Sequence, residues 1–164
     1  MAYQTHKSIT SLIIQRHIEM WKDSFRTKYE NTPLSPTPNA DEVWMHLKVT
    51  FGKPNPGRHI CVDGTRRVDR HTGFILLKVY SPLKKGLAIP LEFTSLIEKT
   101  FSSETWHVEH FHAYPTSLLK YGKEDSYYTA EYAVPFFFNK EAASGDNLSS
   151  FVLDKLTNAN SPLV

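Results

Sequence analysis

The pattern of apolar positions is clearest between residues 73 and 101. Residues 74–80 form a short, β-branched apolar run that stops at Ser81-Pro82, which is typical of a strand buried on most of its surface. Gly86 and Pro90 then bracket the start of a helical pattern. This stretch predicts a central strand, a short turn and an amphipathic helix around which the rest of the chain is arranged. The apolar positions of that helix are Phe93, Leu96, Ile97 and Phe101, with Thr100 on the same face.

A second helical pattern opens the chain. From about Thr5 to Tyr29, apolar residues step by four, three, four and four along one face, with cations toward the far end. So wide an apolar stripe on a terminal helix predicts a docking face, either for the domain's own sheet or for a neighbouring copy. The residues that define this face are Ile14, Ile18, Trp21 and Phe25.

The remaining segments indicate strands and connections. Residues 42–51 alternate apolar and polar positions, and residues 105–112 and 126–138 also have strand character, with a turn expected at 118–125. We therefore expect an α+β fold: a mostly antiparallel sheet of about four to five strands, flanked by a long N-terminal helix, with a second helix between central strands. Residues 1–138 make one domain, and residues 139–164 make a C-terminal extension in which Leu148, Phe151, Val152, Leu153 and Leu156 provide the apolar positions of a short helix or a segment ordered by a partner.

Composition restricts the function classes. A chain of 164 residues, 40% of them hydrophobic, is long enough to bury a core without metal or disulfide help, and it holds one cysteine. The formal net charge of +2 gives no electrostatic footprint of a nucleic-acid-binding domain. The first residues lack the apolar core of a signal peptide and no apolar run is long enough to cross a bilayer, so we expect no membrane partner.

The histidines and the cysteine are the candidates for chemistry. His107, His110 and His112 suggest zinc, but in a strand His107 points away from the other two, so too few ligands converge. Cys61 near His59 or His71 suggests a thiol nucleophile with its base, but no third orienting group accompanies them. The sequence also has no phosphate-binding loop, nucleophile elbow or metalloprotease motif. We therefore expect no catalytic site and no cofactor.

The most polar and basic stretch is the predicted loop of residues 63–72. Three arginines there can neutralise phosphate, but the neighbouring acids weaken that interpretation and no stacking aromatics are interleaved. This stretch is more simply interpreted as a site that contacts a protein partner, or that makes a passing contact with DNA. The residues proposed for partner binding are Arg66, Arg67, Asp69 and Arg70.

Taken in order, these elements resemble the tail terminator proteins of long-tailed bacteriophages. The resemblance covers about residues 5–138. The residues that carry it are the Arg/Asp-rich approach to Thr72-Gly73-Phe74-Ile75-Leu76, then Ser81-Pro82, Lys85-Gly86, the helix ending at Phe101, and Tyr132-Ala-Val-Pro-Phe-Phe.

The resemblance implies a structural virion protein and no enzyme. Members of this family cap the growing tail tube as a ring of six, stop its polymerisation and offer a joining surface to the head–neck connector. It thus implies a homo-hexamer, the tail tube protein and the connector as partners, and the tail–neck junction of the virion as the location, reached from the host cytoplasm during assembly. Two alternatives stay open: another neck or head-completion connector subunit, and a small metal- or nucleic-acid-binding protein.

Overall fold

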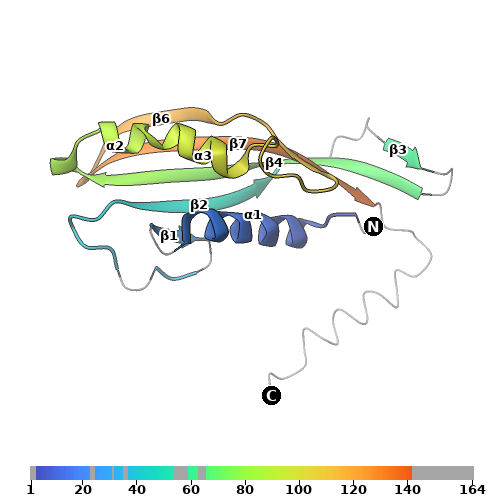
Figure 1. Cartoon of the computed structure of the whole chain (residues 1–164), viewed down its shortest axis with the longest axis horizontal. Helices are drawn as coiled ribbons and strands as arrows, with labels where there is room; N and C mark the ends of the chain where they lie inside the picture. The colour runs from blue at the N-terminus through green and yellow to red at the C-terminus, as the bar shows by residue number, and fades with distance from the viewer. Residues whose placement is uncertain are drawn as a thin grey trace, which may run out of the picture.

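Two long strands, β4 (Arg66–Pro82) and β7 (Tyr127–Glu141), form the middle of the molecule (Figure 1). They run antiparallel and pair continuously, from Val68 opposite Glu141 to Pro82 opposite Tyr127. The computed structural model describes residues 3–22, 25–30, 32–34, 37–53, 59–62 and 66–141. Within these residues the predicted α+β class is confirmed.

Five shorter strands complete a seven-stranded sheet. Strand β2 (Trp44–Phe51) pairs antiparallel with β4, and β1 (Arg26–Tyr29) lies parallel to β2 at the edge. Strand β3 (His59–Val62) pairs with the first residues of β4. On the other side of β7 lie β5 (Phe111–Ala113) and β6 (Ser117–Glu124), one after the other. The sheet thus has β1 at one end and both β5 and β6 at the other.

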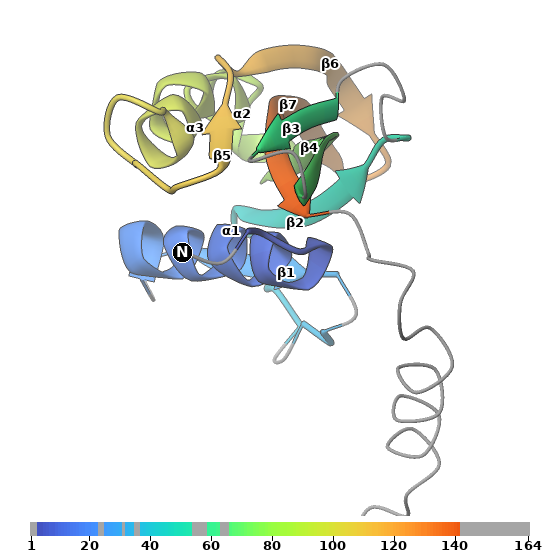
Figure 2. The same cartoon turned by 90° about the vertical axis from the view of Figure 1, so that its right-hand side faces the viewer.

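The helices lie on one face of this sheet (Figure 2). Helix α1 (His6–Trp21) begins with a capping box, because Thr5 and Ser8 each accept a hydrogen bond from the other's backbone N–H through the side-chain oxygen. A short 3-10 turn η2 (Leu83–Lys85) follows β4 and leads into α2 (Ala88–Leu91) and α3 (Phe93–Phe101). None of the helices in the described part of the chain is long and apolar enough to span a membrane.

The core lies between these helices and the inner face of the sheet. Alternate residues of β2, β4 and β7 point inward, because successive side chains of a strand point to opposite faces of the sheet. The hydroxyl of Tyr132, fully buried on β7, donates a hydrogen bond of 2.6 Å to the carbonyl oxygen of Pro90, which ties the sheet to α2. The buried set includes Ile9, Ile13, Met45, Leu47, Ile75, Leu77, Val79, Phe93, Ile97, Phe101, Tyr132, Val134, Phe136 and Phe138.

The prediction for the first helix was wrong at its end and in part of its face. The helix stops at Trp21, Lys22 takes a positive φ of 48°, and residues 26–29 are strand β1. The fully buried residues of α1 are Ile9, Ile13 and His17, whereas Ile18 is 49% exposed. Of the predicted docking face, Ile14, Trp21 and Phe25 are partly buried against the domain's own core, and Ile18 is not.

Other boundaries also differ from the sequence-based expectation. The expected loop of residues 63–72 is strand β4 from Arg66 onward, while residues 63–65 lie outside the described residues. The turn expected at 118–125 is strand β6 up to Glu124, and the strand expected at 105–112 shrinks to β5. Strand β7 continues past the expected domain boundary at 138 to Glu141, and residues 142–164 lie outside the described residues.

Candidate interaction surfaces

The face of the sheet opposite the helices is rich in aromatic and apolar side chains. We call it the open face, because none of the described helices packs over it (Figure 2). Trp44 stacks on Tyr80 with 4.0 Å between ring centroids and an interplanar angle of 3°, and Tyr127 meets both rings edge-on. The other apolar residues of the open face are Phe74, Leu76, Leu119, Pro135 and Phe137.

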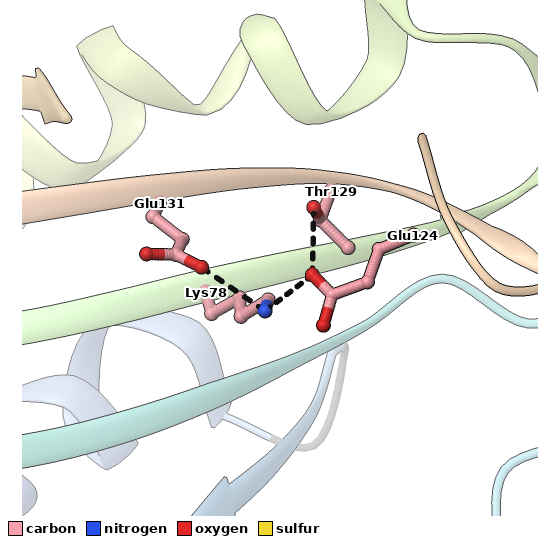
Figure 3. A network of polar contacts seen from close by, with 4 residues as sticks. All are labelled: Lys78, Glu124, Thr129 and Glu131. Carbon is pink, nitrogen blue, oxygen red and sulfur yellow. Dashed lines mark hydrogen bonds and ion pairs between the residues drawn. The ribbon is translucent and has the colours of Figure 1, made fainter. Parts of the chain in front are cut away.

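A lysine network crosses the middle of the open face (Figure 3). The Nζ atom of Lys78 lies 2.6 Å from a carboxylate oxygen of Glu124 and 3.0 Å from one of Glu131. The hydroxyl of Thr129 also donates to Glu124, at 3.4 Å. These contacts join β4 to β7 and to the end of β6, and they add to the backbone pairing that sets the strand order.

The network also fixes the protonation of its members. Burial by itself lowers the pKa of Lys78, but the hydrogen bonds to Glu124 and Glu131 outweigh that effect and raise the pKa above its usual value. The hydrogen bond from Lys78 lowers the pKa of Glu124. A lysine that stays protonated and paired with two carboxylates is neither a nucleophile nor a base at neutral pH, so the arrangement is suited to holding strands together.

The four predicted partner-binding residues all lie on strand β4. The two whose side chains are described, Asp69 and Arg70, are neighbours in the strand and therefore belong to opposite faces of the sheet. The guanidinium carbon of Arg70 lies 4.1 Å from the ring centroid of Phe137 on the open face. The side chains of Arg66 and Arg67 lie outside the described residues, and Asp69 is half-buried and has interactions of its own.

The histidines considered for zinc are spread over one hairpin. His107 is exposed, His110 sits at the turn with φ of 61°, and His112 on β5 stacks on Phe137. The Nε2 atom of His110 lies 3.5 Å from a carboxylate oxygen of Glu109. The described residues contain no group of three or more His, Cys, Asp or Glu side chains placed to hold a metal ion. The side chains of Cys61 and His59 lie outside them.

Sequence reasoning missed the most deeply buried histidine, His17. Its Nδ1 lies 3.0 Å from the hydroxyl oxygen of Tyr29, and its Nε2 has no hydrogen-bond partner among the described residues. Burial lowers the pKa of His17 to about 4. The signal was its position four residues after Ile13 and eight after Ile9, which places it on the apolar stripe.

Three adjoining hollows meet at Phe25, where α1 gives way to β1. The first, of about 360 Å³, is mostly apolar and is lined by Met20 and Trp21 of α1, Phe93 and Leu96 of α3, and Phe25 between α1 and β1. The next, about 460 Å³, runs beside β1 past Ile18 and Tyr29. The third, about 470 Å³, is lined by Phe25 and Val43 together with polar residues that include Arg26, Glu42 and Lys85. These hollows therefore form a groove along the β1 end of the sheet.

Both ends of the sheet have an unpaired strand edge among the described residues. Strand β6 hydrogen-bonds only to β7, and every residue of β6 except Gly122 is exposed. Leu119 is 59% and Tyr121 58% exposed on this strand. At the opposite end, β1 hydrogen-bonds only to β2. Unpaired edges with apolar side chains are templates for pairing with another chain.

Comparisons with known proteins support the fold alone. No protein-family model and no curated protein matches the chain. A solved structure that carries no functional name is similar, with a TM-score of 0.57 at 14% sequence identity; the match covers 82% of this chain and 96% of that one. At this identity the similarity shows a shared architecture, not a shared activity.

Proposed function

We propose that this protein is a phage tail terminator, a structural virion protein that caps the tail tube as a ring of six copies and presents a joining surface to the head–neck connector. The proposal begins from the sequence resemblance over residues 5–138. The observation that carries it further is a pair of unlike strand edges, at the two ends of one sheet, that no described strand pairs with.

The β6 edge has the features of a subunit contact. It is eight residues long, it is exposed along its length, and Leu118, Leu119 and Tyr121 expose large apolar surfaces. Monomeric proteins usually protect such edges with short strands, charged side chains, bulges or covering segments. Strand β6 has a bulge between Leu118 and Lys120 and carries Lys120, Lys123 and Glu124, but large apolar side chains remain exposed on it, so we infer that a second chain covers the edge.

The β1 edge differs from the β6 edge in length, direction and surroundings. Strand β1 is four residues long, parallel to its neighbour and flanked by the groove at Phe25. Two different edges favour a head-to-tail contact, in which β6 of one copy meets the β1 end of the next. A head-to-tail contact closes into a ring when its rotation divides a full turn, and otherwise it forms a filament.

A ring built in this way has two different sides, because every copy points the same way around it. One side is free to match the end of the tail tube, and the other presents a different surface to the connector. Tube growth stops because the outer side offers no site for the next tube subunit. This function requires shape complementarity and no bond-making chemistry.

Substitution at the β6 edge tests the proposed ring. Six copies of the 18.8 kDa chain give a ring of roughly 110 kDa. At high protein concentration, sedimentation is expected to show this species for the wild type and a folded 18.8 kDa monomer for Leu119→Asp. The matched control is Ser95→Asp, an exposed position on α3 that lines none of the three hollows at the β1 end, and this variant is expected to keep the ring.

The test has two outcomes that contradict the proposal. A wild-type protein that stays monomeric at high concentration and in virions has no ring to close. A Leu119→Asp variant that assembles as well as the control shows that β6 is not the contact.

A further inference from the structure

The first turn of helix α1 docks on the sheet through a contact between two histidines. The ring of His6, the first residue of α1, meets that of His71 on β4 edge-on, with 5.0 Å between the centroids and an interplanar angle of 90°. His6 also meets Phe51 and Phe138 edge-on, at 4.7 and 5.3 Å, and His71 stacks on Phe138 at 5.4 Å. These four rings, which we call the histidine cluster, join α1 to β2, β4 and β7.

The charges around the histidine cluster disfavour a proton on both imidazoles. Lys140 on β7 repels a positive charge on either histidine, whereas Asp69 on β4 attracts one on His71. Each imidazolium also repels the other. His6 lies at the N-terminus of α1, where the helix dipole disfavours a cation, and the next residue, the exposed Lys7, adds a further positive charge.

The docked cluster therefore accommodates one proton more easily than two. Burial, and after it the charge of Lys140, lowers the pKa of His6 and of His71, so both rings are neutral at pH 7. A single imidazolium at His71 is compensated by Asp69 and by the ring face of Phe138. A second one on His6 faces that like charge across 5.0 Å.

The segment that precedes the core residues of α1 is otherwise lightly held. The side-chain amide of Gln4 donates a hydrogen bond of 3.1 Å to the carbonyl oxygen of Glu109, and this bond is exposed to water. The ring of Tyr3 lies 4.4 Å from that of His110 in the same hairpin. The first fully buried residue of α1 is Ile9, so the helix from Ile9 onward is docked independently of the histidine cluster.

We propose that the histidine cluster is an acid-released latch: the docked turn takes up one proton, and the second proton releases residues 3–8 from the sheet while Ile9 and the rest of α1 stay packed. Because docking lowers the pKa of both rings, the docked turn is favoured above about pH 6.5 and loses stability progressively below it. Two coupled protons make the release steeper than one histidine allows. The inference does not rest on the proposed tail function, since it concerns one chain.

NMR of the full chain tests the latch through the ring contacts of His6. At about pH 7.5 we expect nuclear Overhauser effects between the ring protons of His6 and those of Phe51 and Phe138, and at about pH 5.0 a loss of their intensity by about tenfold. The effect between Phe51 and Phe136, which belong to the sheet, persists at both pH values and reports that the protein stays folded.

Variants at His71 separate the latch from a general effect of acid. In His71→Phe only one proton remains for the cluster, so the contact between His6 and Phe138 is expected to survive at about pH 5.0. His71→Gln is a second neutral variant, which serves if the larger ring does not fit. The matched control is His110→Gln, which removes the titratable ring beside Tyr3 and keeps the acid response of the wild type.

Three results overturn the proposal. The His6 contacts persist in the wild type at about pH 5.0, or they are lost equally in the His71 variants, or they are lost only together with the contact between Phe51 and Phe136. The readout is the same in a monomer and in a ring. Failure of the sedimentation experiment on β6 therefore leaves this inference intact, and failure of the latch leaves the proposed function intact.

Discussion

The imidazole Nδ1 of His17 lies 3.0 Å from the hydroxyl oxygen of Tyr29, and this contact ties helix α1 to the edge strand β1. The ring of His17 is 1% exposed and stacks on Trp21 with 5.1 Å between centroids. Its Nε2 faces no hydrogen-bond partner among the described residues, so a second proton on the ring has no acceptor. The neutral form is therefore the one that the fold accommodates.

We predict that His17 makes the fold sensitive to acid. Because its pKa falls from 6.5 when unfolded to about 4 when folded, the unfolded state binds the proton first as the pH drops. Stability contributed through His17 is complete above about pH 6.5 and is lost progressively down to about pH 4, by about 3 kcal/mol in total. Urea unfolding between pH 7 and pH 4 measures the loss.

The matched variant for this experiment is His17→Leu. Burial also lowers the pKa values of His6 and His71, so acid affects the stability of the wild type through several histidines. The difference in unfolding free energy between the wild type and the variant isolates the contribution of His17. The difference in unfolding free energy is expected to shrink toward low pH. A variant with the same pH dependence as the wild type contradicts the assignment.

We predict that Tyr132→Phe destabilises the protein by about 1–2 kcal/mol, since it leaves the buried carbonyl of Pro90 without its donor. Tyr121→Phe, at an exposed position on β6, is the control and is expected to change stability by less than about 0.5 kcal/mol. The denaturant midpoints of unfolding of the two variants and the wild type, measured at neutral pH, check this prediction. Equal midpoints for the two variants contradict the role given to this hydrogen bond.

Gly73 is a position where a methyl group does not fit. A Cβ there would meet the carbonyl oxygen of Thr50 on β2 and the ring of Phe136 on β7, and the carbonyl cannot move without disturbing the β2–β4 pairing. We predict that Gly73→Ala costs about 2–3 kcal/mol, against about 0.5 kcal/mol or less for Thr72→Ala at the exposed neighbouring position. Thermal unfolding of the two variants checks this, and a Gly73→Ala midpoint at or above that of Thr72→Ala refutes it.

The Lys78 network is expected to contribute modestly. A double-mutant cycle of Lys78→Met and Glu131→Gln measures the coupling across the 3.0 Å contact between Nζ and the carboxylate. Because both side chains are partly exposed, we predict a coupling below about 1 kcal/mol that weakens in 1 M salt. Additive single variants, or a coupling insensitive to salt, contradict this description.

The sequence predicted the elements in which apolar residues recur with one regular spacing, either that of a strand or that of a helix. The strand at 74–80 and the alternating strand at 42–51 are present, and Phe93, Ile97 and Phe101 are buried as expected. The first helix was extended too far because Trp21, Phe25 and Tyr29 continue its spacing, although the backbone turns at Lys22. Helical spacing of apolar residues therefore does not distinguish a longer helix from a helix followed by an edge strand.

The edge strand β6 and the charged start of β4 were missed for a physical reason. A pattern of apolar residues reflects burial, and β6 buries almost none of its side chains, so its charged residues indicated a turn. The start of β4 is held by backbone pairing with β3 and β7, which leaves no trace in the apolar pattern. The unpaired edges and the open face, on which the proposed contacts depend, appear only once the strand order is known.

The proposed closed ring at the end of a tail tube is tested most directly by electron microscopy of tail tube protein polymerised with and without this chain. We predict tubes that stop growing and carry one six-copy ring at an end, with roughly 110 kDa of added mass. Tubes that continue to lengthen, or particles in which the chain is found away from the junction of head and tail, contradict it.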